Sequence, residues 1–122
     1  MRSALFFALA TVFAAGGATA QTTGDATKGK AAFATCAMCH SDIAGKNGIG
    51  PSLFGVVGRN AGTAPGFKYS AAMTKAGPWT SAKLDAFIAA PKTAVPGTSM
   101  PFGGLRDAAK RADIVAYLAT LK

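Results

Sequence analysis

The feature that most limits how this chain can fold is a long stretch, residues 41–66, rich in residues that interrupt regular structure. Eleven of its 26 positions are Gly, Pro or Asn, and no apolar period runs through it. A second stretch, residues 92–104, has two prolines and three glycines. A loop as long as the first normally carries function or surrounds a bound group. Regular structure must therefore come from the short segments between these two loops.

Those segments have the spacing of short helices. Each begins near a residue that can cap a helix, and its apolar residues recur at helical intervals. No segment alternates apolar and polar residues as a half-buried strand would. The predicted class is therefore all-α, with three to four short helices. The expected helices run from Asp25 towards the cysteines, from Ser70 or Ala71 to Gly77, from Thr80 to Pro91, and from Asp107 through Leu121.

Three or four such helices bury little apolar surface. Isolated helices below about 12–15 residues are marginal in water, and a chain of 122 residues provides for one domain with a modest core. Something large must complete that core. A haem, which is a flat apolar body that helices and loops can wrap, fits this need.

Residues 36–40 read Cys-Ala-Met-Cys-His, the attachment signal for a covalently bound c-type haem. Cys36 and Cys39 can form thioethers with the two vinyl groups, and His40 then falls under the iron. A thioredoxin-like pair would need a strand before it and a helix after it. A structural zinc site would need four ligands, whereas the chain has two Cys and one His. A plain disulfide is geometrically possible but leaves His40 and the long loops unexplained.

The second axial ligand of the iron can be approached by elimination. His40 is the only histidine, which excludes ligation by two histidines. Met38 lies between the anchoring cysteines and cannot reach the opposite face, and Met73 lies in a short helical turn, where methionine commonly fills a core. Met100 is followed by Pro101 and lies in a loop restricted by prolines. We expect Met100 to be the ligand, and a haem with both axial positions filled has no open site for a substrate.

The chain from residue 21 onward resembles the class I c-type cytochromes, the family of mitochondrial cytochrome c and bacterial cytochrome c2. The resemblance covers the whole of this region in order and spacing. The matching positions are Gly29, Phe33, residues 36–40, Gly50-Pro51, Gly58-Arg59, residues 64–67, Tyr69, Trp79, Pro91, residues 96–98, Met100, Phe102 and residues 113–118.

The resemblance implies roles for several of these residues. The first and last helices would cross where Gly29 and Phe33 meet Ile114 and Tyr117. The Pro51 carbonyl would accept a hydrogen bond from His40. Two further groups are implied: propionate-binding Arg59, Tyr69 and Trp79, and Thr98 and Phe102 on the methionine side of the haem.

The sequence also departs from the mitochondrial pattern. Phe87 replaces a tyrosine and Met73 an asparagine that help to bind a buried water in those relatives, so the sequence does not predict the same polar network here. Thr35 and Ser99 stand where the mitochondrial proteins have lysines, which predicts a weaker docking charge.

The function that the resemblance implies is one-electron transfer by a non-enzymatic carrier. The implied partners are redox proteins with acidic docking faces, such as a cytochrome bc1-type reductase, a terminal oxidase, a dehydrogenase or a photosynthetic centre. The alternative is a haem enzyme or gas sensor, for example a peroxidase or a carrier of CO or NO. That alternative requires an open or readily opened iron position.

The first twenty residues have the pattern of a cleaved secretion signal. Arg2 precedes an apolar run, and residues 18–20 (Ala-Thr-Ala) form a small-residue cleavage pattern. We therefore expect a cytochrome c domain at residues 21–122 in the bacterial periplasm, as a monomer with no transmembrane segment. The apolar run is shorter than the roughly 20 residues that span a bilayer.

The net charge favours acidic partners. It is +8 for the full chain, and loss of Arg2 leaves 12 basic against 5 acidic residues, or +7. The basic residues are scattered singly, which argues against a nucleic-acid surface. We expect Lys46 and Lys92 near an exposed haem edge and, with Arg106, facing an acidic partner. A basic surface that serves only solubility is the alternative.

Overall fold

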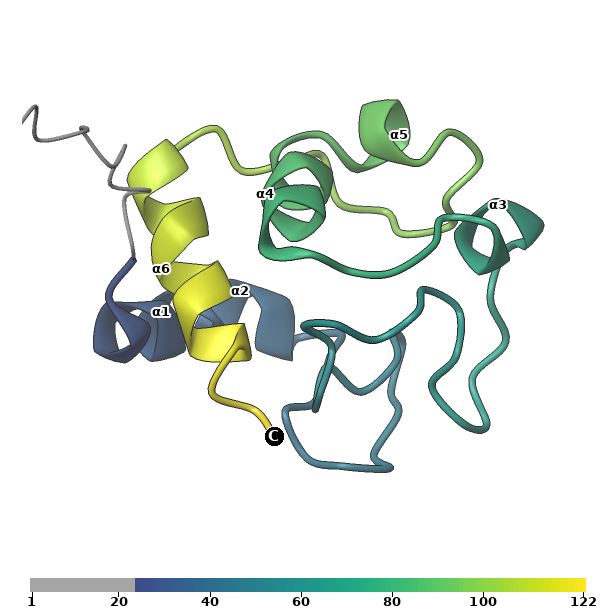
Figure 1. Ribbon diagram of the computed structural model, residues 1–122, viewed down its shortest axis with the longest axis horizontal. Coiled ribbons are helices and arrows are strands. Elements are labelled where there is room, and N and C mark those ends of the chain that lie inside the picture. Colours follow the sequence, from purple (N-terminus) through teal and green to yellow (C-terminus); the bar gives the residue numbers. More distant parts are fainter. Residues whose placement is uncertain (1–23) are drawn as a thin grey trace, which may run out of the picture.

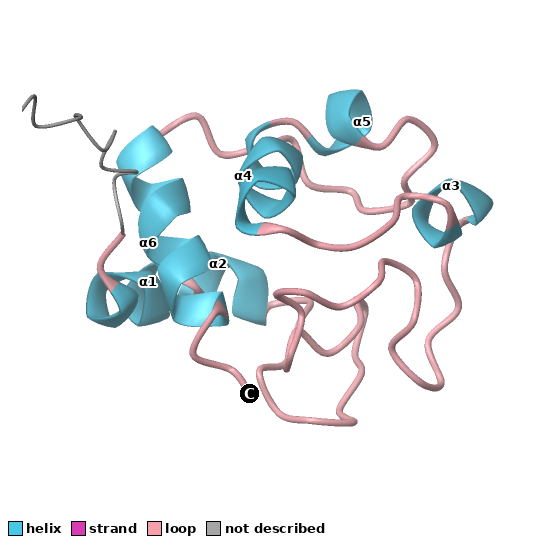
Figure 2. Ribbon diagram, viewed as in Figure 1, coloured by secondary structure: helices cyan, strands magenta, loops and turns pink. Residues whose placement is uncertain are grey.

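The computed structural model describes residues 24–122, which form six helical segments joined by long loops (Figure 1). The segments are α1 (Ala26–Ala32), α2 (Ala34–Ala37), α3 (Ala71–Thr74), α4 (Ser81–Ala89), α5 (Pro91–Ala94) and α6 (Ala108–Leu118). Within this range there is no strand, and Figure 2 shows helices separated by loops. The all-α prediction is confirmed. The expected secretion signal, residues 1–20, lies outside the described residues.

The helices between residues 24 and 122 are all short. None of them is long and apolar enough to cross a membrane.

The first and last helices cross closely, as expected. A β-carbon added to Gly29 would lie only 1.8 Å from the Asp113 carbonyl oxygen, so only glycine lets α1 approach α6 at this point. The rings of Phe33 and Tyr117 pack beside this crossing with their centroids 5.4 Å apart. A hydrogen bond also joins the two helices here, because the Asp25 backbone N–H donates to Asp113 Oδ1 over 2.7 Å.

The predicted cap residues begin their helices. Asp25 accepts hydrogen bonds from the N–H groups of Thr27 and Lys28, which orients α1. The same role falls to Ser70, Thr80 and Asp107 at the starts of α3, α4 and α6.

Several helix boundaries differ from the sequence prediction. The helix α3 ends at Thr74 rather than Gly77, and α6 ends at Leu118 rather than Leu121. The expected first helix is interrupted at Phe33, so it appears as α1 followed by the single turn of α2. Pro91 was expected only to stop a helix, with a loop from residue 92. Instead α4 ends at Ala89 and Pro91 opens α5, because a proline is tolerated in the first turn, where no backbone N–H is needed. The loop prediction is therefore wrong for residues 92–94.

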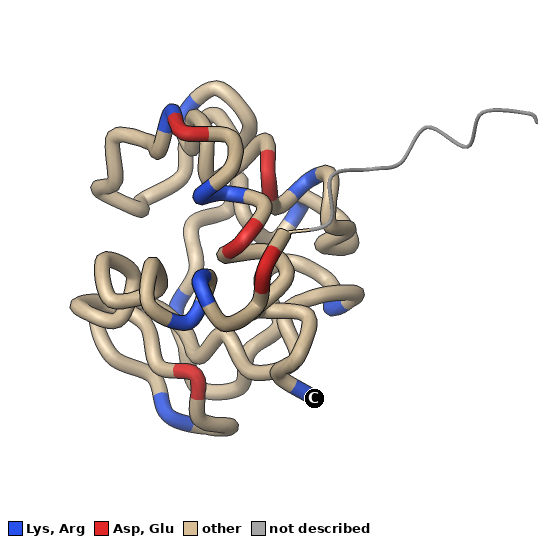
Figure 3. The backbone as a smooth tube through the Cα atoms, turned by 90° about the vertical axis from the view of Figure 1, so that its left-hand side faces the viewer, with Lys and Arg blue, Asp and Glu red and all other residues tan. Residues whose placement is uncertain are grey.

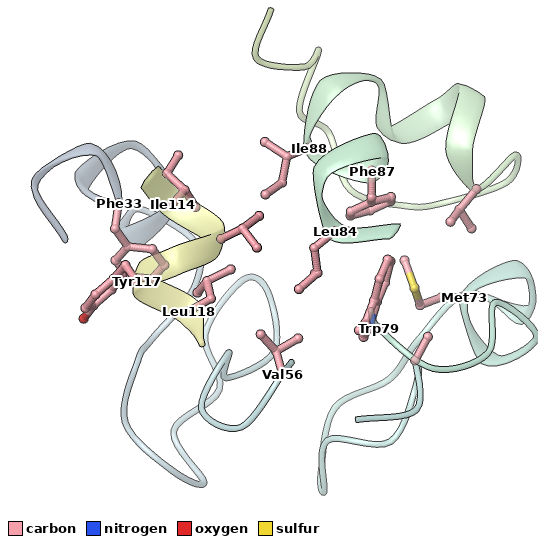
Figure 4. Packing of buried hydrophobic residues seen from close by; sticks show 13 residues of the cluster. Phe33, Val56, Met73, Trp79, Leu84, Phe87, Ile88, Ile114, Tyr117 and Leu118 are labelled. Carbon is pink, nitrogen blue, oxygen red and sulfur yellow. The ribbon is translucent and has the colours of Figure 1, made fainter. Parts of the chain in front are cut away.

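The elements surround a central space. In Figure 1, α1 and α6 lie on the left, α4 and α5 above, α3 on the right, and the loop of residues 41–66 below. Figure 4 shows the buried side chains facing this space from two sides: Ile114 and Leu118 on α6, opposite Leu84 and Trp79. The long loop thus forms one wall of the core.

Candidate functional site

The central space is a cavity of about 490 Å³. Its lining is largely apolar and includes Val56, Leu84 and Leu118, which are at most 5% exposed. The volume lies within the range of pockets that enclose organic cofactors, about 300–1,000 Å³. All ten site residues expected from the sequence border this one cavity: Cys36, Cys39, His40, Pro51, Arg59, Tyr69, Trp79, Thr98, Met100 and Phe102.

On one side of the cavity, the end of α2 brings the two thiols and the imidazole together. The thiols are half-buried and not joined by a disulfide. His40 Nδ1 lies 2.7 Å from the Pro51 carbonyl oxygen. A carbonyl can only accept, so Nδ1 must carry the proton, and Nε2 is left with the lone pair that binds a metal. The predicted contact between His40 and Pro51 is confirmed.

Gly50 fixes the position of this ring. A β-carbon there would lie 2.4 Å from His40 Cε1, so any larger residue would displace the imidazole. The Gly50 N–H also donates to the Cys39 carbonyl over 2.8 Å, which attaches the loop to the cysteine segment. The signal in the sequence was a glycine directly before Pro51.

Burial sets the protonation of these groups. It lowers the pKa of His40, and the hydrogen bond to Pro51 opposes part of that change. The imidazole is therefore neutral near pH 7, which is the form that binds a metal. Burial, with a smaller effect from Cys39, raises the pKa of the Cys36 thiol. Cys36 is thus held as a thiol rather than as the thiolate of a redox-active pair.

The opposite wall contains the loop with Met100. The Met100 N–H donates to Thr98 Oγ1 over 3.3 Å. At the far end of the loop, the Leu105 N–H donates to the Ile88 carbonyl over 2.9 Å. Next to it, Gly104 has φ +110°, and a β-carbon there would lie 2.2 Å from the Ala89 carbonyl oxygen. The loop is therefore attached to α4 where it leaves the cavity.

Met73 and Phe87 border the same cavity and are 9% and 7% exposed. The Phe87 ring packs on Trp79 with 5.1 Å between centroids. Besides the exposed Met38, two methionines line the space, Met73 and Met100. Met73 comes from the single helical turn α3, as the sequence suggested.

Arg59 carries a donor without a partner. Its two terminal nitrogens donate to the carbonyls of Phe54 (2.9 Å) and Ser52 (3.1 Å), which closes the loop around the guanidinium. Its Nε is buried and has no hydrogen-bond partner among the described residues. Burying a polar group unpaired is costly, and Arg59 borders the cavity. An anionic group on a bound molecule would satisfy this donor.

Tyr69 leaves a second donor in the same region. Its hydroxyl oxygen accepts the Ala64 N–H over 3.0 Å, so its own proton is free to donate elsewhere. Trp79 is 6% exposed and borders the cavity beside them. The residues present thus fit a flat apolar group with acidic substituents, as a haem has.

Two exposed large hydrophobic residues at the cavity were not recognised from the sequence as part of the site. Met38 and Ile49 both border it, yet are 80% and 73% exposed. For Ile49, the signal in the sequence was an apolar residue between two glycines, Gly48 and Gly50. By contrast, Lys46 and Lys92, although exposed, do not line this cavity.

The comparisons with known proteins agree with this geometry. The profile of the family described as Cytochrome c matches residues 26–122. The chain belongs to the cytochrome c family. It is 52% identical to cytochrome c2 of Rhodopila globiformis over 101 residues, which are 81% of this chain and 95% of that protein.

Two further relatives support the assignment. The c-type cytochrome cy of Rhodobacter capsulatus is also 52% identical over 101 residues, although these make up only 50% of that protein. The solved structure of cytochrome cH from Methylobacterium extorquens superimposes with a TM-score of 0.74 at 49% identity, over 80% of this chain and 99% of that one. The fold is thus the class I cytochrome c fold.

Membership of the cytochrome c family settles the cofactor and the general function. The chain binds one covalently attached haem c, and it is an electron-transfer protein rather than an enzyme. The CAMCH segment and the unpartnered donor of Arg59 are the features of this chain that match such a group.

Proposed function

We propose that this cytochrome c is a diffusible one-electron carrier whose iron is held by His40 and Met100. The haem, when bound, supplies the Fe(II)/Fe(III) couple. The observation that carries the proposal is the position of the two residues on one cavity: His40, with Nε2 free for a metal, and Met100, on the loop attached to α4. Methionine ligation raises the reduction potential relative to harder ligands.

The other residues of the cavity take supporting roles in this proposal. Cys36 and Cys39 form the thioethers, and the Pro51 carbonyl orients the histidine ring. Arg59, Tyr69 and Trp79 bind the propionates, and the free Nε of Arg59 is the contact that most directly supports this. Thr98 and Phe102 line the methionine side.

The proposed location and partners follow from sequence and charge. Residues 1–20 are a signal removed on export to the periplasm, and residues 21–122 are the mature monomer. Its partners are redox proteins with acidic docking faces, such as a bc1-type reductase, a terminal oxidase, a dehydrogenase or a photosynthetic centre. In Figure 3, the Lys and Arg positions are scattered along the chain rather than gathered into one cluster.

The experiment that tests the proposal is a redox titration of the holoprotein with a carbon monoxide control. A carrier gives a reversible one-electron couple, and its ferrous form does not bind carbon monoxide on mixing at neutral pH. A haem enzyme or gas sensor needs an open iron position and would bind the gas at once. Rapid binding by the unmodified protein would overturn the carrier proposal.

A further inference from the structure

Lys83 differs from the other lysines of the described chain. It is half-buried, whereas every other lysine between residues 24 and 122 is exposed. Its ammonium donates a hydrogen bond to the Ala76 carbonyl, in the turn before α4. The same nitrogen lies 5.9 Å from the centroid of the Trp79 ring, within the range of a cation–π contact.

The start of α4 explains this position. Thr80 caps the helix by accepting the Lys83 N–H over 3.1 Å, which places Lys83 in the first turn. Side chains on a helix lean towards its N-terminus, so Lys83 extends back over the preceding residues. The side chain ends beside Gly77, where a β-carbon would lie 3.5 Å from Nζ, an ordinary van der Waals contact.

Trp79 connects this charge to the haem cavity. The indole lines the cavity and is 6% exposed. Its backbone pairs with the segment of Arg59, since the Trp79 N–H donates to the Arg59 carbonyl over 2.8 Å and the Gly58 N–H donates to the Trp79 carbonyl over 2.7 Å. A fixed cation therefore lies against a ring that forms part of the cavity wall.

We propose that the positive charge of Lys83, held in place against Trp79, raises the reduction potential of the haem. This inference rests on the proposed one-electron function. Reduction adds one negative charge to the centre, so a nearby cation favours the reduced form. The Ala76 carbonyl and the Trp79 ring hold the cation in place, and its partial burial weakens screening by salt.

The deciding variant is Lys83→Gln, which removes the charge and keeps an N–H donor for Ala76. We expect its equilibrium constant for accepting an electron to fall by about three- to tenfold, the upper limit corresponding to ~59 mV for a one-electron couple. Lys83→Arg should keep the wild-type potential. Lys75→Gln is the matched control, because Lys75 is exposed.

Salt separates the two positions. Raising the ionic strength from 0.01 to 1 M shortens the Debye length from about 30 to about 3 Å, so any effect of Lys75→Gln should vanish while that of Lys83→Gln persists. Thermal unfolding of each holoprotein checks that the fold is kept.

Two results would overturn the inference. One is a Lys83→Gln variant whose reduction potential equals that of the wild type, or equals that of Lys75→Gln at high salt. The other is a potential that falls in Lys83→Met but not in Lys83→Gln, which would assign the effect to the hydrogen bond alone. A wild type without a reversible one-electron couple would instead refute the carrier proposal itself.

Discussion

The Tyr117 hydroxyl donates a hydrogen bond of 2.5 Å to Asp42 Oδ2, joining the last helix to the segment that follows His40. The two residues are 75 positions apart in sequence. Tyr117 is 7% exposed, and its ring packs against Phe33 at the crossing of α1 and α6. The helix crossing and the histidine segment are therefore stabilised together.

Replacing Tyr117 by Phe should lower the free energy of unfolding by about 1.5 kcal/mol at pH 7, since hydrogen bonds to charged groups contribute about 1.5–3 kcal/mol. Chemical denaturation of the two holoproteins measures this difference. Thr120→Val is a control, because its hydroxyl bonds only within the last turn, to the Tyr117 carbonyl.

The same contact predicts a dependence on pH. The bond to Asp42, then burial and the Asp42 charge, raise the pKa of Tyr117 above its usual value near 10. Above pH 10 the unfolded chain loses this proton while the folded chain keeps it. The stabilisation is therefore complete below pH 10 and is lost as the pH rises through the folded pKa. A wild type and a Tyr117→Phe variant that lose stability equally from pH 9 to 11 would contradict this.

Met100→Ala should open the iron while His40 and the two thioethers retain the haem. We expect the variant to bind carbon monoxide readily in the ferrous state and to have a lower potential, because methionine ligation favours ferrous iron. It should also lose the weak red absorption band that iron–sulfur bonding gives in the ferric state of similar cytochromes. Stopped-flow mixing and absorption spectra measure these changes.

Met73→Ala is the matched control, because it removes the thioether of the buried methionine that borders the cavity. Because Met73 is buried, its truncation should lower the free energy of unfolding by about 2–5 kcal/mol without opening the iron. Loss of the red band in this variant alone would transfer the ligand assignment to Met73.

Phe87→Tyr should shift the reduction potential with the fold unchanged. Phe87 is 7% exposed and borders the cavity, so the added hydroxyl enters a mostly apolar space. A buried donor without a partner costs about 1–3 kcal/mol, which limits the expected loss of stability. Voltammetry of the two proteins measures the shift, and identical midpoints would mean that residue 87 does not affect the iron.

Reduction by an acidic partner should slow as ionic strength rises. Lys46, Lys92 and Arg106 are exposed, and no salt bridge involves them in the described chain. The Debye length falls from about 30 Å at 0.01 M to about 8 Å at 0.15 M, which weakens electrostatic steering. Stopped-flow rates measure this effect. Rates that stay constant over this range would show that the charge serves only solubility.

Much of the fold could be predicted from the sequence because its determinants are local. Asp25, Thr80 and Asp107 act as caps through their own side chains, and the apolar positions of α6 repeat at helical spacing. The break at Phe33 and the new turn at Pro91 could not be predicted, because they depend on how the neighbouring segments pack.

The site shows the same division. The CAMCH segment predicts the haem through chemistry that five consecutive residues contain. The close approach of Gly50 to the His40 ring and the missing partner of Arg59 Nε depend on how the irregular loop of residues 41–66 folds. The role of Lys83 could not be found in advance either, because its contacts with Ala76 and Trp79 exist only in the folded chain.

The attachment of the Met100 loop beside Gly104 has a consequence for how this sequence can vary. A β-carbon on Gly103 meets nothing within 4 Å, whereas one on Gly104 would lie 2.2 Å from the Ala89 carbonyl oxygen and would require an unfavourable positive φ. Two adjacent glycines thus have opposite tolerances. In a library randomised at both codons, selection for a native spectrum would let residue 103 vary and would retain glycine at 104. Gly104 is not a ligand of the iron, but its substitution would disturb the loop that carries Met100.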